Sequence, residues 1–129
     1  MNNKEQQNIQ SEKTLTEIFK YNAEAGASEY HVMIHSTKPE DTYEEQLNAV
    51  LNTYDNLLAK ELKGGVAVFK RYFLSDAANQ ADTLLALTTE GSDCALSIVE
   101  QPPLDGTKIA LWVYLQTDIQ TQVLHTGLF

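Results

Sequence analysis

The sequence has little cysteine, little positive charge and no long hydrophobic run. A single cysteine, Cys94, cannot form a disulfide within the chain, which predicts a reducing, cytoplasmic location. Nine Lys and Arg face 18 Asp and Glu, and the net charge of −9 argues against nucleic acid and anionic membranes as partners. The longest apolar run, Ile109–Leu115, is far shorter than the ~20 residues of a membrane-spanning helix. The polar first residues also lack the apolar core of a signal peptide.

The length and composition of the chain are those of one globular domain. The chain has 129 residues, of which 43% are hydrophobic, enough to bury a core. Residues 1–13 are almost all polar and are expected to form a mobile tail, with a single domain over residues 14–129. Within Thr14–Ala25, apolar residues recur at helical spacing before Gly26, so this segment is expected to form a short helix.

Two long helices are predicted from caps and apolar stripes. Thr42 and Glu45 form a capping-box pattern ahead of apolar residues that recur every three or four positions as far as Leu62. Gly64-Gly65 is a stop signal for this helix rather than a phosphate-binding loop, and no cofactor is expected. The second helix is expected after a Ser75 or Asp76 cap and before Gly91.

Four segments have the composition of strands, and the last two are expected to form a hairpin. Combined with the helices they predict an α+β fold, a single sheet with both long helices on one face. Aromatic residues such as Phe69 and Trp112 would lie on the other face, which predicts an oligomer that packs through its sheets. The four strand segments are Glu29–Thr37, Val66–Leu74, Cys94–Glu100 and Thr107–Thr117.

Three passages resemble the RidA/YjgF family of enamine/imine deaminases, which has a chorismate-mutase-like fold. Tyr43–Leu51 resembles the family's first long helix, and Val68–Asp76 resembles the strand that runs into its second helix. Leu96–Glu100, followed by Pro103–Gly106 and an apolar strand, resembles the late "RSxVEVxxLPxGAxVEIE" passage. The resemblance implies a homotrimer with a barrel-like core and small-molecule clefts between subunits. The family's usual opening strands are expected to be replaced by the polar tail and short helix.

The residues that the resemblance would make catalytic are missing. Leu96 stands in place of the arginine that clamps a substrate carboxylate, and Trp112 stands in place of a late carboxylate linked to the attacking water. The family's asparagine in the second helix falls near Leu84. No catalytic residue is therefore assigned, and the cleft is expected to be drier, filled or remade.

Four residues remain as candidates for ligand binding. Arg71 is the only arginine, and it is either a relocated anion clamp or a strand residue that is paired or solvated. Ser97 is retained from the "RS" pair and would bond a ligand or the backbone. Glu100 would line the cleft rim or lie on the surface, and Trp112 would face the cleft.

Three functions stay open at this point, while a ribonuclease, an activity also attached to the family's name, is least expected because of the net charge of −9. The chain would be a RidA-like trimer with a metabolite cleft, an imine deaminase using substitutes such as Arg71 and Glu100, or an oligomerisation module of a longer protein, which the ending at Leu128-Phe129 suggests. Any enzymatic activity would be hydrolytic and deaminase-like. His31 and His35 would lie ~13 Å apart on a strand at ~3.3 Å per residue, so no metal site is expected.

Overall fold

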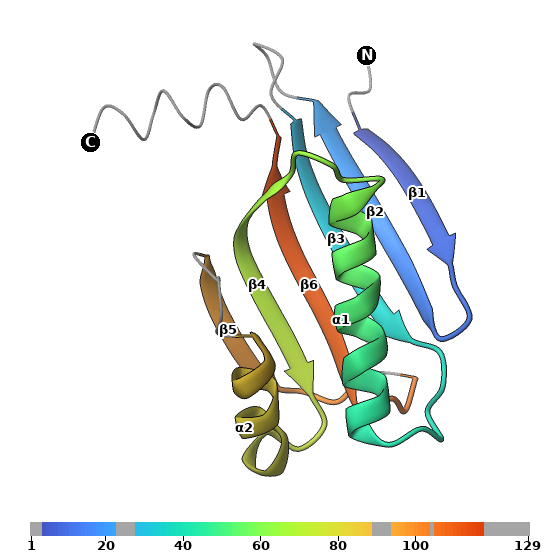
Figure 1. The fold of residues 1–129 in the computed structure, drawn as a ribbon, viewed down its shortest axis with the longest axis vertical. Coiled ribbons are helices and arrows are strands. Elements are labelled where there is room, and N and C mark those ends of the chain that lie inside the picture. Colours follow the sequence, from blue (N-terminus) through green and yellow to red (C-terminus); the bar gives the residue numbers. More distant parts are fainter. Residues whose placement is uncertain (1–3, 23–27, 89–93, 104, 118–129) are drawn as a thin grey trace.

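The computed structural model describes residues 4–22, 28–88, 94–103 and 105–117, which form an α+β fold (Figure 1). In these residues one mixed sheet has the strand order β1-β2-β3-β6-β4-β5. All neighbours in the sheet are antiparallel except β4 and β5, which are parallel. The elements in chain order are β1 (Lys4–Gln10), β2 (Thr14–Asn22), β3 (Ser28–Ser36), α1 (Tyr43–Ala59), β4 (Val66–Leu74), α2 (Ala77–Thr88), β5 (Ala95–Glu100) and β6 (Ile109–Gln116).

The two helices are crossover connections that lie on the same face of the sheet (Figure 1). The first helix, α1, connects β3 to β4 across the intervening β6, and α2 connects the parallel neighbours β4 and β5. Helices in crossovers of one hand pack on one face when successive strands are added in one direction. The predicted single sheet with both helices on one face is therefore confirmed.

The amino-terminal predictions were wrong. In place of a mobile tail and a short helix, β1 and β2 form an antiparallel pair. Thr14, Thr16 and Ile18 are buried while the residues between them are half-exposed, a period of two that belongs to a strand. The spacing of Leu15, Ile18 and Phe19 suggested a single helical stripe. In the strand, Ile18 faces the core, and Leu15 and Phe19 lie on the opposite face. The polar strand β1 suits the sheet edge, where solvent covers one side.

The predicted hairpin of the last two strands was also wrong. The parallel pairing of β5 with β4 places β4 between β5 and β6. The chain therefore crosses under the end of β4 to reach β6, through a loop that contains Pro102, Pro103 and a turn at Gly106 with φ of 82°. Other boundaries agree well, since Val66–Leu74 is β4 as predicted. Gly91, expected to end the second helix, lies outside the described residues.

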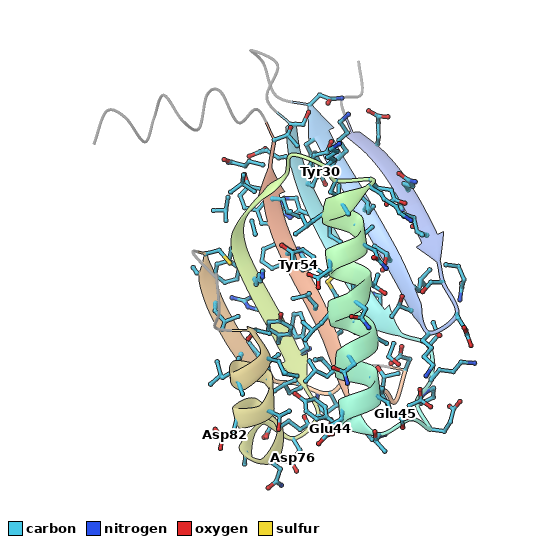
Figure 2. All side chains as sticks on the ribbon, in the orientation of Figure 1. Tyr30, Glu44, Glu45, Tyr54, Asp76 and Asp82 are labelled. Atoms are coloured by element: carbon cyan, nitrogen blue, oxygen red, sulfur yellow. The ribbon has the colours of Figure 1, made fainter. Side chains whose placement is uncertain are left out.

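The main core lies between α1 and the covered face of the sheet. Tyr54, which Figure 2 labels, projects from α1, and the Nζ atom of Lys70 lies 4.7 Å from its ring centroid. The residues of β6 that face α1 are fully buried, as are Val32, Ile34, Tyr72 and Leu74 beside them on β3 and β4. The largest members of this core are Ile34, Leu47, Tyr72, Leu74, Leu84, Ile109, Leu111 and Leu115.

Buried glutamines tie the starts of both helices to the end of the sheet. Gln46, only 1% exposed, donates to the carbonyl of Asp41 at 2.9 Å and accepts from the backbone N–H of Lys108 at 2.9 Å. Gln80 accepts from the N–H of Asp76 at 2.9 Å and donates to Ser75 at 3.0 Å. Each glutamine is the fourth residue of its helix. The capping box of Thr42 and Glu45 is confirmed and completes the start of α1.

We expect Gln46→Leu to lower the free energy of unfolding by about 2 kcal/mol. The carbonyl of Asp41 and the N–H of Lys108 would lose their hydrogen-bond partner at a site that water reaches poorly. Urea unfolding followed by the fluorescence of Trp112 measures the change. Asn52→Leu, on the exposed side of the same helix, serves as the control and should change stability by less than about 0.5 kcal/mol. Equal effects of the two substitutions would contradict the role of Gln46.

Candidate functional site

The second face of the sheet has no helix over it in the described part of the chain, and we call it the open face. Three neighbouring rows of its side chains cross the strands, as the register defines. The first row is Phe19, His31, Tyr114 and Phe69; the second is Glu17, Met33, Trp112, Arg71 and Ser97; the third is Leu15, His35, Ala110, Phe73 and Val99. Aromatic and apolar side chains make up most of the first and third rows, whereas the second row also carries Glu17, Arg71 and Ser97.

An aromatic cluster occupies the middle of the open face. The ring of His31 stacks on Trp112 with centroids 5.6 Å apart and lies 5.0 Å from Tyr114. Tyr21 meets His31 edge-on at 5.6 Å, and Phe69 lies 5.5 Å from Trp112. Ring pairs of this kind contribute about 0.5–1.5 kcal/mol each beyond simple burial. The cluster is thus ordered by its own contacts, although most of its side chains are only half-buried.

Three of the four predicted ligand-binding residues meet on this face. Arg71 has Ser97 and Trp112 as its neighbours in the second row. The Nε atom of Arg71 donates to Ser97 Oγ at 3.4 Å, and its guanidinium carbon lies 5.3 Å from the centroid of Phe69. Within the described residues, no carboxylate forms an ion pair with Arg71. The guanidinium therefore keeps donors for a further partner.

Glu100 does not join the other three residues. It lies beside Leu74 in the register, on the face that the helices cover, and its Oε1 accepts from the backbone N–H of Ala77 at 2.9 Å. A carboxylate is favourable there because the first turn of a helix presents unpaired N–H groups. Leu96 pairs with Lys70 and also lies on the helix-covered face. Arg71 lies on the open face, so it does not occupy the position that an arginine at residue 96 would have.

Sequence reasoning missed a pocket at the lower end of the open face, beside the third row. It has a volume of about 310 Å³, and the loop that precedes β6 forms one wall. Glu17 was placed in a helix, so its proximity to His35 could not be seen. Asp105 was interpreted only as part of a turn. The pocket is lined by Met33, His35, Phe73, Gln101, Pro102, Pro103, Asp105 and Ala110.

Charged groups surround one side of this pocket. His35 Nε2 lies 3.0 Å from Glu17 Oε1. Burial would raise the pKa of Asp105, but hydrogen bonds from the hydroxyl and N–H of Thr107, helped by the nearby His35, lower it below its ordinary value. At the other end of the face, burial and a short hydrogen bond to Glu29 raise the pKa of Tyr114. Acidic side chains therefore lie at both ends of the open face, with Glu17 and Asp105 at the pocket end.

The pKa of Asp105 gives a pH test of this arrangement. Because its folded pKa lies below the ordinary value of 3.8, ionised Asp105 stabilises the fold above that pH and loses this contribution as the pH falls through the folded pKa. Asp105→Asn should lower the free energy of unfolding at pH 7 by less than about 1 kcal/mol, since the group is well solvated. Urea unfolding at several pH values should show the difference shrinking below about pH 4. A difference that does not change with pH would contradict it.

The chain was compared with protein-family models, with curated proteins and with solved structures, and none of them matches it. No described helix has the length and apolar character needed to cross a membrane. No group of three His, Cys, Asp or Glu side chains within the described residues is arranged to hold a metal ion. The resemblance to the RidA/YjgF family therefore rests on the three sequence passages.

Proposed function

We propose that the chain is the protomer of a cytoplasmic, RidA/YjgF-like homotrimer that binds a small metabolite between subunits and lacks the usual deaminase residues. The observation that carries this proposal is the open face. Large apolar surfaces on soluble proteins are typical of interfaces and ligand sites. The open face presents aromatic side chains over its central strands, with Phe69, Trp112 and Tyr114 near the middle.

The amino-terminal strands add support. The family's usual opening strands were expected to be missing, yet β1 and β2 lie at the start of this chain. One apparent departure from the family is thereby removed. The trimer and the barrel-like core formed by three open faces are part of the proposal, as is the chorismate-mutase-like fold.

The missing deaminase groups are the reason for proposing binding without the usual catalysis. An enzyme that used Arg71 and Glu100 as substitutes would need both in one site. Within one chain these two residues lie on opposite faces of the sheet, and Glu100 already accepts a hydrogen bond from α2. Arg71, Ser97 and Trp112 are left as the groups that a ligand on the open face would meet.

A single substitution on the open face should dissociate the trimer. Phe69→Glu places a charge in the aromatic cluster, and burying it would forfeit about 1.5–3 kcal/mol per subunit or more. Sedimentation equilibrium is expected to give a mass near three chains for the parent and near one chain for this variant. The fluorescence of Trp112, the only tryptophan, should shift to longer wavelength on dissociation.

The matched control is Leu87→Glu, because Leu87 is 54% exposed on α2 at the helix-covered side. This variant should keep the mass of the parent. Circular dichroism of both variants checks that the fold is intact. A parent protein that sediments as a strict monomer at micromolar concentration would refute the proposed trimer.

The role of Arg71 is tested with an anionic probe, phenylacetate. Arg71→Lys keeps the charge but loses the planar pair of donors, and we expect it to weaken binding about tenfold. Arg71→Ala should weaken binding further, and both variants should remain trimeric. Calorimetric titration measures the affinities. Unchanged affinity in both variants, or loss of the trimer in both, would assign Arg71 a structural role instead.

A further inference from the structure

The pocket beside the third row has a shape and composition suited to one small molecule. Its volume of about 310 Å³ is within the range of pockets that hold small organic molecules. Its apolar wall comes from three strands and the loop before β6, with Met33, Phe73 and Ala110 contributed by the sheet. Such walls accept an apolar body, and the flexible side chain of Met33 can adjust to it.

The polar side of the pocket holds the Asp105 carboxylate, which only accepts, beside the Gln101 amide, which can donate and accept. Both hydrogen bonds that Thr107 makes to Asp105 end on Oδ1, and within the described residues Oδ2 has no hydrogen-bond partner. Glu17 lies at the Nε2 atom of His35. A carboxylate only accepts, so Nε2 carries the proton in the neutral ring, and Nδ1 is left as an acceptor.

The balance of charge around the pocket is negative. Two carboxylates, Glu17 and Asp105, stand against one imidazole, and the whole chain carries a net charge of −9. An anionic group would be repelled here, and it would find its partner in the second row, at Arg71. A cation, in contrast, would meet Asp105 Oδ2 and His35 Nδ1, with Phe73 nearby to offer an aromatic ring.

We propose that this pocket binds a small primary amine, with the ammonium group at Asp105 and His35 and the apolar body against Phe73 and Met33. Glu17 positions His35 and adds negative charge without lining the pocket itself. The inference goes beyond the proposed function, because this pocket is a second site whose lining does not include Arg71, Ser97 or Trp112. It rests on that function only for the walls that neighbouring subunits would add, because one chain forms the pocket described here.

The test compares two probes of the same shape on the full chain, 2-phenylethylamine and 2-phenylethanol. Calorimetric titration should show the amine binding at least about fivefold more tightly, as one partly solvated ion pair allows. Added salt should reduce this preference, since it screens charges at a pocket mouth. In the parent protein, proton NMR should show the amine shifting the ring signals of His35.

Two variants and a control identify the residues that cause the preference for the amine. Asp105→Asn should abolish most of the preference for the amine over the alcohol, and Glu17→Gln should reduce it. Asp55→Asn removes the same charge from an exposed position on α1, at the other side of the sheet, and should leave the preference intact. Circular dichroism verifies folding, and the comparison of probes on the parent protein stands even where a variant does not fold.

Equal affinity for the two probes, or no binding of the amine, would overturn the proposal. A preference that persists unchanged in Asp105→Asn would overturn it as well. Sedimentation of the same samples separates this inference from the proposed function. A monomer that prefers the amine would refute the proposed trimer and support the amine site. A trimer that shows no preference would support the proposed trimer and refute the amine site.

Discussion

One constraint shapes this protein: its described chain has helices for only one face of a wide sheet. The core forms where α1 covers β3, β4 and β6, and the fully buried residues gather there. The other face has to be stabilised by contacts within the sheet itself. The stacked rings of His31, Trp112 and Tyr114 supply such contacts, and the hydrogen bond of Tyr114 to Glu29 fixes one end of the cluster.

The polar bonds at the helix starts link the core to the pocket on the opposite face. Gln46 accepts from the N–H of Lys108, and the carbonyl of Lys108 accepts from the N–H of Ser75, so both crossovers meet at the entry to β6. Asp105 and Thr107 lie immediately before that entry and form their own bonds there. The loop that closes the pocket is therefore held from the covered side of the sheet.

The sequence predicted best where a local signal and the tertiary structure agree. The capping box at Thr42 and the extent of β4 are examples, because caps and uniform apolar strands are encoded by neighbouring residues. The strand β2 was missed because polar and apolar residues in Thr14–Asn22 fit two periods almost equally well. The faces of Arg71 and Glu100 depend on the parallel register of β4 and β5, which sequence spacing does not reveal. The pocket brings together His35 of β3 and Asp105 of the loop before β6, which lie far apart in the sequence, so no local motif could predict it.

The arrangement of charge on the open face reconciles assembly with ligand binding. Aromatic rings fill the first row and the centre of the second, where the proposed contact between subunits would exclude water at little electrostatic cost. The charged groups lie at the flanks, with Arg71 towards β5 and the pair of Glu17 and His35 on β2 and β3. Burying these charges without partners would be costly, so packing through the centre leaves the flanks for water or for polar ligands. If the chains assemble as proposed, a molecule held in the pocket would therefore lie beside the contact between subunits, and its amine would meet the carboxylate of Asp105.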